Sequence, residues 1–325
     1  MTDDQLAAEI KQRSRQLGFD KCGIAQAGPS GQATFLREWL AEGRHAGMEW
    51  LAKRTDERAD IREYLPGAQS VICVAMSYHV PLAEPAEGQT GKVARYALSG
   101  DYHKHMKKRL HALADWLRVE TKCETKACVD TAPVLEREWA ARAGIGWQGK
   151  NTLVMDTKLG SYLLLGEVVT TLTLPPDRPA VDRCGTCTRC IEACPTNAIT
   201  PYALDPRKCI SYWTIEDRGE TLGVDPHGWL FGCDICQEVC PWNRKALPAT
   251  DPHAQPKPHL AAGRLDPREV LDWSPEQYQD VTRGTALKRV KLPQWKRNAA
   301  AVLDHTKRAP QRSAGEPVAN DKPGM

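Results

Sequence analysis

The sequence predicts a mixed α/β domain, then a cysteine-rich domain, then a short helical segment. Three observations predict this fold class. Helical and strand patterns are mixed over residues 1–175, eight of the twelve cysteines lie between Cys184 and Cys240, and helical patterns return after a Pro-rich loop. The 325 residues are 41% hydrophobic and 26% charged, which excludes a wholly disordered chain. The predicted domains are 1–175, 176–250 and 251–308, and composition predicts disorder for 309–325.

The elements of the first domain follow from periodicity. Apolar residues spaced three and four apart predict helices, and β-branched runs predict strands. The predicted elements, in chain order, are helices over 3–17 and 32–42, a buried strand over 70–78, helices over 101–119 and about 133–143, and one or two strands within 161–174.

Charge and hydropathy restrict the cellular location of the protein and the kinds of partner that it can bind. No apolar run approaches the ~18 residues of a membrane span, and the charged N-terminus lacks the apolar core of a signal peptide. We therefore expect a cytoplasmic protein that does not contact membranes and is a monomer. Between Arg283 and Arg312 there are nine basic residues and one acid, which is +8, so the remainder of the +3 chain sums to −5. A basic pole on an acidic body indicates a polyanionic partner.

The cysteine block contains two related runs. The first, CGTCTRCIEACP, has the C-x2-C-x2-C-x3-C-P spacing of bacterial two-cluster ferredoxins. The second, CDICQEVCP, is shorter and also ends in Cys-Pro, with Cys209 lying upstream. In this motif three neighbouring thiolates hold one 4Fe–4S cluster, and the Cys before Pro serves the other. The predicted ligand sets are Cys184, Cys187, Cys190 and Cys240 for one cluster and Cys194, Cys209, Cys233 and Cys236 for the other.

A pair of zinc sites is the alternative, since zinc also binds C-x2-C pairs. Zinc sites do not require an exchanged fourth Cys followed by Pro in both runs, so the spacing favours two iron–sulfur clusters. Two such clusters imply electron transfer in single steps, and hence a low-potential electron donor, which the sequence does not identify.

The stretch GIGWQG (residues 144–149) matches G-x-G-x-x-G, with Glu167 eighteen residues beyond Gly149. A dinucleotide site needs a strand before these glycines and a helix after them. Here the predicted order is reversed, which argues against that interpretation. Two alternatives remain: a helix end followed by a tight turn, or glycines that let the backbone approach a flat cofactor closely.

Four longer motifs carry a resemblance to a known family. They are RYALSGDYH (95–103), VDTAPVLEREWAARAGIGWQGKN (129–151), CISYWTIE (209–216) and CDICQEVCPWNR (233–244). Over about residues 5–305 the chain resembles epoxyqueuosine reductases. The resemblance implies reduction of epoxyqueuosine to queuosine at the wobble position of tRNA, as the last step of queuosine biosynthesis. It also implies cobalamin, two 4Fe–4S clusters and a nitroreductase-like N-terminal domain similar to the cobalamin domain of reductive dehalogenases.

The same resemblance assigns site residues. Asp130, in the family's VD-[ST]-AP motif, is the expected proton donor. Conversion of an epoxide to an alkene adds two electrons and expels the oxygen as water, so the oxygen must receive protons. A carboxyl group buried beside an apolar corrin has a raised pKa and stays protonated near neutrality. The alternative is that Asp130 is a helix N-cap. Expected cobalamin contacts are Lys53, Arg58, Tyr96, Asp130, Lys150, Asn151, Ser161 and Ser211.

The lower-axial His loop of some cobalamin enzymes, D-x-H-x-x-G, is not found in this sequence. The stretch DPHGWL has Asp225 and His227, but Leu230 replaces the Gly. This agrees with the resemblance, since that family binds cobalamin without the loop.

The basic segment 285–300, TALKRVKLPQWKRNAA, is the expected contact with the tRNA anticodon loop. Basic side chains suit phosphates, and an aromatic ring can stack on an unpaired base. The expected contacts are Lys288, Arg289, Lys291, Trp295, Lys296 and Arg297. The alternative is an amphipathic helix with Trp295 in the core and its charges in solvent. The patch of Lys104, Lys107, Lys108 and Arg109 is either a second contact or the exposed face of a helix.

Two other functions remain open at this stage. One is a corrinoid iron–sulfur reductase of a small substrate, such as a dehalogenase, which the basic segment argues against. The other is a ferredoxin-like electron carrier or RNA-binding module, which would leave about 175 residues of α/β domain without a purpose.

Overall fold

The computed structural model describes residues 1–308, so the predicted disorder of 309–325 lies outside the described residues. The N-terminal part is built on a four-stranded antiparallel sheet in the order β1-β2-β7-β4. The strands are β1 (Lys21–Gln26), β2 (Ser70–Ser77), β7 (Leu163–Thr170) and β4 (Thr125–Cys128). Every residue of β2 is buried, as its uninterrupted apolar run predicts.

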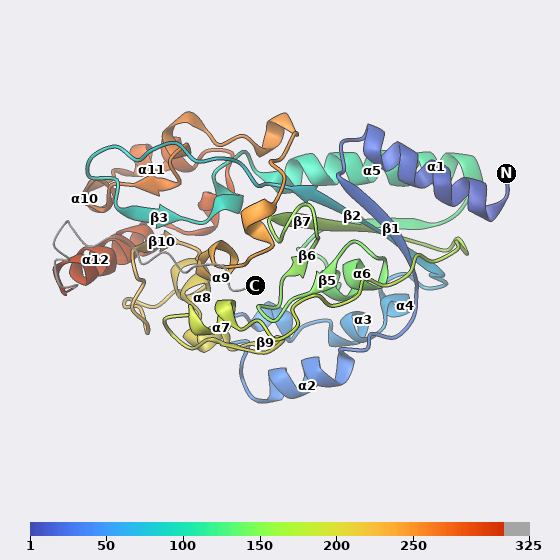
Figure 1. Cartoon of the computed structure of the whole chain (residues 1–325), viewed down its shortest axis with the longest axis horizontal. Coiled ribbons are helices and arrows are strands. Elements are labelled where there is room, and N and C mark those ends of the chain that lie inside the picture. The colour runs from blue at the N-terminus through green and yellow to red at the C-terminus, as the bar shows by residue number, and fades with distance from the viewer. Residues whose placement is uncertain (309–325) are drawn as a thin grey trace, which may run out of the picture.

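Helices cover both faces of this sheet (Figure 1). On one face α1 (Asp3–Gln16) and α5 (Tyr102–Thr121) pack Ile10, Leu110 and Leu113 against the strands. On the other face α6 (Glu136–Arg142) contributes Trp139, which is almost fully buried. The helices predicted over 3–17 and 101–119 are thereby confirmed, because their apolar stripes face this core.

Shorter elements line the face of the sheet that carries α6. They are α2 (Ala33–Ala41), η1 (Glu49–Leu51), α3 (Thr55–Ala59), α4 (Ile61–Tyr64), and the hairpin of β5 (Trp147–Gln148) with β6 (Val154–Met155).

The glycines of GIGWQG shape the end of α6 and the β5–β6 hairpin. Gly144 follows α6 with φ +73°, in the left-handed region that favours glycine after a helix. A Cβ atom at Gly146 would lie 2.2 Å from the carbonyl oxygen of Met155 across the hairpin. The motif is therefore a helix end and a tight turn, and the order of elements excludes a dinucleotide fingerprint.

The cysteine-rich part consists of short elements. Each cysteine run ends in a single helical turn, α7 (Arg189–Glu192) or α9 (Ile235–Glu238), and these two turns contact each other. The other elements are β8 (Ile199–Thr200), β9 (Ala203–Leu204), η3 (Pro206–Lys208), α8 (Ile210–Ile215), β10 (Trp229–Phe231) and η4 (Asn243–Lys245).

The C-terminal helices cover a second sheet in which β3 (Gly91–Val93) pairs with β10 and with β11 (Arg264–Leu265). Its core contains Phe231 and Trp295. Figure 1 shows β3 lying beside β10 among the C-terminal elements. The helical elements there are η2 (Arg95–Ala97), η5 (Pro252–Ala254), η6 (Pro258–Leu260), α10 (Pro267–Asp272), α11 (Pro275–Thr282), η7 (Ala286–Arg289) and α12 (Leu292–Arg308).

Residues 91–98 therefore build the C-terminal unit, although in sequence they lie within the predicted first domain, 1–175. Within residues 1–308, none of the helices combines the length and the apolar character needed to cross a bilayer.

Candidate active site and cluster sites

Asp130 lies in the loop between β4 and α6, where two side chains from the start of α5 hold its carboxylate. Tyr102 Oη donates a hydrogen bond to it, and His103 Nε2 lies 2.9 Å from Asp130 Oδ1. The other ring nitrogen of His103 lies 2.7 Å from Asp101 Oδ1. The N-cap of α6 is Leu135, so the interpretation of Asp130 as a helix cap is wrong.

These contacts shift the pKa values of Asp130 and His103. Burial raises the pKa of Asp130, but the hydrogen bonds from His103 and Tyr102 and the charges of His103 and Lys107 outweigh it, so its pKa lies below the ordinary value. Burial lowers the pKa of His103, but Asp130 and Asp101 outweigh it and leave that pKa raised. The expected raised pKa of Asp130 is therefore not found in the protein itself, and the contact between Asp130 and His103 favours the proton on His103.

Asp130 borders two adjoining cavities. One, of about 400 Å³, is lined largely by apolar side chains that include Trp39 and Trp50. The other, of about 220 Å³, lies beneath Tyr96 and Tyr102. Arg137, from the first turn of α6, lines both cavities and a third one of about 270 Å³. A large, mostly apolar space with a few polar groups at one place fits a flat organic cofactor bound beside an acid.

The third cavity connects this space to the cysteine-rich part. Four cysteines line it together with Pro195, Ile210 and Ile235. Four free thiols around a small cavity with apolar walls fit a 4Fe–4S cluster, which needs four thiolates. They are Cys194, Cys209, Cys233 and Cys236, the set that the motif predicts for one cluster.

The other four predicted ligands also lie together. Burial and the charges of Cys184 and Cys240 raise the pKa of Cys190, and burial and the charges of Cys184 and Cys187 raise that of Cys240. These influences require short separations. The structure thus brings together Cys240 from the second run with the first three cysteines of the first run, as the exchanged-ligand pattern predicts.

The expected cobalamin contacts separate into three groups. Arg58 lines the first cavity, Ser161 the second, and Tyr96, Asn151 and Ser211 the third, with Tyr96 also lining the second. The remaining two expected contacts are both lysines.

Lys150 and Lys53 do not line any of these three cavities. Lys150 donates hydrogen bonds to the carbonyl oxygens of Gly185 and Cys187, 2.7 and 3.0 Å away, and so holds the first cysteine run. Lys53 is exposed outside these cavities, and its carbonyl oxygen accepts a hydrogen bond from Arg58.

Sequence reasoning missed four residues of this site: Tyr102, His103, Glu136 and Arg137. All four lie inside two of the quoted motifs, RYALSGDYH and VLEREW. Burial and the charge of Glu167 raise the pKa of Glu136, which lines the cavities beside Asp130. The first and second motifs are about 28 residues apart, so only the folded chain shows that they meet.

Two expected tRNA contacts are wrong. Trp295 has no exposed surface and packs on Phe231 and Trp273, with ring centroids 5.7 and 5.4 Å away. The side chain of Arg297 is only 7% exposed, and its guanidinium pairs with Asp217 at 2.7 Å and donates to backbone oxygens. A base cannot stack on a ring inside the core, so the core alternative is correct for Trp295.

The remaining basic residues stay available to a polyanion. Lys288 and Lys291 are exposed, Lys296 is half-buried, and Arg289 is 51% exposed beside Glu216. On α5, Lys104, Lys107 and Lys108 are exposed, whereas Arg109 pairs with Asp251.

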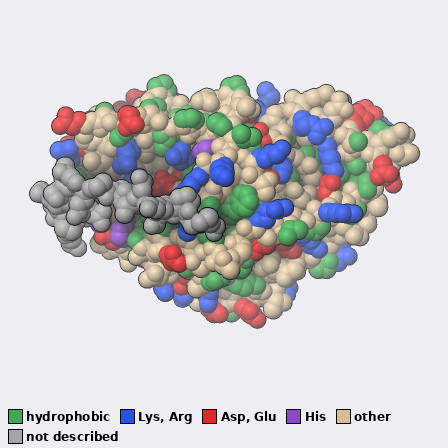
Figure 2. Space-filling model, in the orientation of Figure 1, with side chains coloured by type: hydrophobic (Ala, Val, Ile, Leu, Met, Phe, Trp, Pro, Cys, Tyr) green, Lys and Arg blue, Asp and Glu red, His purple; other side chains and the backbone are tan. Residues whose placement is uncertain are grey.

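Basic groups from two elements lie close to Asp130. Lys107 from α5 and Arg289 from η7 both interact electrostatically with Asp130. On the face drawn in Figure 2, Lys and Arg side chains are most numerous over the middle and right-hand part of the molecule.

Fold and site together define the class: an iron–sulfur oxidoreductase with an acid–base group beside a cofactor-sized cavity. A family model described as "Epoxyqueuosine reductase QueG, DUF1730" matches residues 58–131, and one described as "4Fe-4S double cluster binding domain" matches 183–243. The chain is 42% identical to the epoxyqueuosine reductase of Synechococcus sp. (strain RCC307) over 304 residues, which are 91% of this chain and 93% of that one. The chain belongs to the epoxyqueuosine reductase family.

Other relatives agree. The epoxyqueuosine reductase of Escherichia coli (strain K12) is 39% identical over 309 residues, covering 92% of this chain and 81% of that one. A crystal structure of epoxyqueuosine reductase with a tRNA-Tyr epoxyqueuosine-modified tRNA stem loop superimposes with a TM-score of 0.85 at 30% identity, covering 94% of this chain and 82% of that one.

Proposed function

We propose that this chain reduces epoxyqueuosine to queuosine at the wobble position of tRNA, with cobalamin in the cavities beside Asp130 and electrons from two 4Fe–4S clusters. One observation carries the proposal. The cavity that Asp130 borders adjoins, through Arg137 and Tyr96, the cavity lined by four cysteines. An electron path from a cluster to a substrate at Asp130 is therefore short. An external low-potential donor would reduce the clusters one electron at a time.

Arg58, Tyr96 and Ser161 are the side chains that would hold cobalamin, since they line the two cavities that Asp130 borders. Cobalamin, when bound, supplies the reducing metal centre for the two-electron step. The apolar walls around Trp39 and Trp50 would exclude water from this space.

The protein must supply the protons. Conversion of the epoxide to an alkene breaks both C–O bonds, takes up two electrons and releases the oxygen as water, which consumes two protons. The raised pKa of His103 favours its protonated form, and its Nε2 lies 2.9 Å from Asp130 Oδ1. In the proposed mechanism Asp130 passes that proton to the departing oxygen, and Tyr102 holds the carboxylate in place through its hydrogen bond.

The anticodon loop would approach between α5 and η7. Lys107 and Arg289 flank Asp130 from these two elements, and Lys288 and Lys291 are exposed nearby in sequence. Reaching the reactive ring requires the wobble nucleotide to leave its stack, at a cost of a few kcal/mol. Phosphate contacts with these cations would offset that cost.

The test is the nucleoside profile of tRNA from a strain that lacks this protein. Epoxyqueuosine should accumulate, and the wild-type gene should restore queuosine. The Asp130→Asn variant should keep its iron and cofactor absorbance yet fail to restore queuosine. A strain without the protein that still has normal queuosine would refute the proposed activity.

A further inference from the structure

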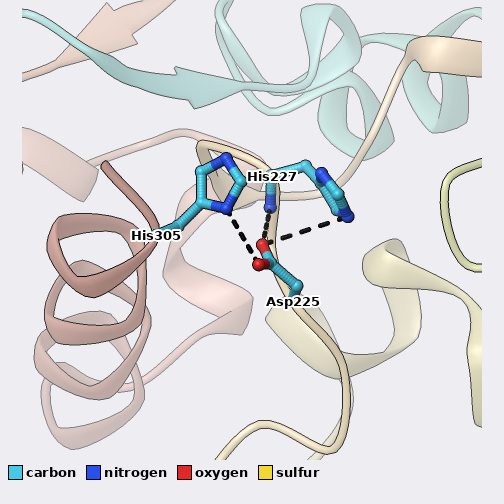
Figure 3. A group of neighbouring side chains, drawn as sticks. All are labelled: Asp225, His227 and His305. Atoms are coloured by element: carbon cyan, nitrogen blue, oxygen red, sulfur yellow. Dashed lines mark hydrogen bonds and ion pairs between the residues drawn. The ribbon is translucent and has the colours of Figure 1, made fainter. Parts of the chain in front are cut away.

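Three side chains at the far end of the C-terminal unit form a group that the proposed reaction does not use. They are Asp225, His227 and His305 (Figure 3). A ring nitrogen of each histidine and a carboxylate oxygen of Asp225 all lie within 4.8 Å of one another. His305 Nδ1 is 2.8 Å from Asp225 Oδ2, and His227 Nε2 is 4.0 Å from Asp225 Oδ1.

The three residues come from two segments that are 80 positions apart in sequence. Asp225 and His227 lie in the connection from α8 to β10, and His305 lies in the last turns of α12. Figure 3 shows both rings turned toward the carboxylate between them. The imidazole centroids are 5.1 Å apart and inclined at 57°.

The rest of α12 is already fastened to the same stretch of chain. Asn298 donates hydrogen bonds to the carbonyl oxygens of Thr214 and Leu230, both at 2.9 Å. Its neighbour Arg297 pairs with Asp217. His305 follows Asn298 by seven residues, which returns it to the same face of the helix. The three-residue group is therefore the last of a row of contacts between α12 and the α8–β10 connection.

The backbone also presents these ligands in a fixed arrangement. The N–H of His227 donates to Asp225 Oδ1 at 2.7 Å, and His227 has φ +46°, in the left-handed region. The turn thus places the His227 ring on the same side as the Asp225 carboxylate. Each of the three side chains keeps between 26% and 44% of its surface exposed, so an ion could reach them from solvent.

We infer that Asp225, His227 and His305 bind a divalent transition metal of the Zn²⁺ class, which joins the end of α12 to the α8–β10 connection. Two imidazoles and one carboxylate form a donor set that such metals prefer, whereas Ca²⁺ and Mg²⁺ prefer oxygen alone. Ligands of a tetrahedral zinc ion are roughly 3.3 Å apart, given bond lengths of about 2.0–2.1 Å. Small side-chain rotations bring the three atoms from their present separations to that value. Solvent would supply the remaining ligand.

This site is separate from the cluster ligands and from Asp130, so the inference does not depend on the proposed function. The metal would cross-link the end of α12 to the α8–β10 connection, and α12 is the helix that follows the basic residues 288 and 291.

The test measures zinc uptake by anaerobically purified protein whose clusters are intact, with iron determined in the same sample. Wild-type protein should retain one equivalent of Zn²⁺ after gel filtration, with all its iron. His305→Gln and Asp225→Asn should bind Zn²⁺ about tenfold more weakly or worse. His111→Gln, which changes an exposed histidine on α5, is the matched control and should bind as wild type does.

A second readout separates metal binding from general damage. Added Zn²⁺ should slow amide hydrogen exchange in the last turns of α12 in wild type, and not in His305→Gln. Equal zinc uptake by wild type and His305→Gln, or no uptake by wild type at micromolar Zn²⁺, would overturn the inference. The amide exchange of His305→Gln without zinc shows whether that variant is folded.

Discussion

The ammonium of Lys150 lies 3.0 Å from the carbonyl oxygen of Cys187, so the β5–β6 hairpin of the first domain touches the first cysteine run. The same ammonium also donates to Gly185. A cation this close to a cluster ligand stabilises the more negative, reduced cluster. In the Lys150→Met variant we therefore expect a more negative reduction potential for the cluster predicted at Cys184, Cys187 and Cys190. A redox titration followed by electron paramagnetic resonance measures it.

The control for this variant is Lys158→Met, an exposed lysine whose backbone oxygen, rather than its side chain, contacts Leu247. Its cluster potentials should equal those of wild type. If Lys150→Met leaves both potentials unchanged while keeping its iron, the ammonium has no electrostatic effect on the cluster.

The exchanged ligand pattern predicts which cluster each cysteine serves. Cys240 is in the second run but lies with the first three cysteines of the first run, and Cys209 shares a cavity with Cys233 and Cys236. Cys240→Ser should therefore perturb the signal of one cluster and Cys209→Ser the signal of the other. Mössbauer and electron paramagnetic resonance spectra would distinguish the two clusters. Cys123→Ser, outside both sets, should leave both signals intact. Identical spectral losses in the two ligand variants would contradict the assignment.

Activity should depend on pH through His103. Its raised pKa keeps the imidazolium form present above the ordinary value of about 6.5, and proton donation is lost as pH rises through that raised pKa. Without His103 the cationic partner of Asp130 is lost, and a carboxyl group by itself is a weak proton source near neutrality. His103→Gln should thus lower the single-turnover rate at pH 7 by roughly 10²-fold and move the alkaline limb to lower pH.

Tyr102→Phe leaves the imidazole of His103 in place and removes only a neutral hydrogen bond to Asp130. Removing its hydrogen bond to the carboxylate removes one cause that lowers the pKa of Asp130, so that pKa should rise. The alkaline limb that His103 sets should therefore remain in Tyr102→Phe, whereas His103→Gln should lose it. If both variants keep the wild-type profile, the group of three residues does not deliver the proton.

The sequence predicted those elements that are determined by residues close together in the chain. The helices over 3–17 and 101–119 were predictable because their apolar stripes are set by residues within each segment, and the cluster motif because its spacing is local. The contact of Asp130 with Tyr102 and His103 was not, since those residues are some 28 positions apart and the loop between β4 and α6 positions the carboxylate.

The amphipathic pattern of α12 left its orientation undecided. A tryptophan between basic residues suits either a core or an RNA surface, and only the second sheet, which places Phe231 and Trp273 against Trp295, decides for the core. Arg297 likewise acquires its partner Asp217 from a turn 80 residues earlier. Sequence alone also gave no sign that β3 would join the C-terminal unit, because three residues carry too little pattern.

Glu167 predicts an unusual pH dependence of stability. It is fully buried in the middle strand β7, opposite Cys73 and Cys128 in the neighbouring strands. Burial raises its pKa to about 8. The unfolded chain ionises this carboxyl near pH 4.3, so the folded state holds an extra proton between about pH 4.3 and 8, and stability falls as pH rises through that window.

Glu167→Gln removes this titration. The free energy of unfolding of the variant should exceed that of wild type by about 1 kcal/mol or more at pH 8, with a difference that shrinks toward pH 5. Urea denaturation at several pH values measures it. Glu63→Gln, at an exposed position, should follow the wild-type curve. A constant difference between Glu167→Gln and wild type across this range would mean that Glu167 is ionised in the folded state.

Within the basic segment 285–300, we expect some residues to determine stability and others to determine tRNA binding. Trp295→Ala opens a cavity among Phe231 and Trp273 and should cost about 3–5 kcal/mol of stability. Lys288→Ala and Lys291→Ala change exposed side chains, so their stability should stay within about 0.5 kcal/mol of wild type. Each lysine variant should instead weaken binding of a tRNA anticodon stem loop and reduce the magnitude of the slope of log K against log[salt] by about 1.

The salt dependence distinguishes a phosphate contact from an indirect effect. A lysine that only shapes the protein would change affinity equally at all salt concentrations, whereas a phosphate contact is lost progressively as salt replaces it. Lys158→Met, on the β6–β7 connection, serves again as the charge-matched control. If its salt slope changes as much as that of Lys288→Ala, the tRNA is held by the general charge of the protein and not by the segment around η7.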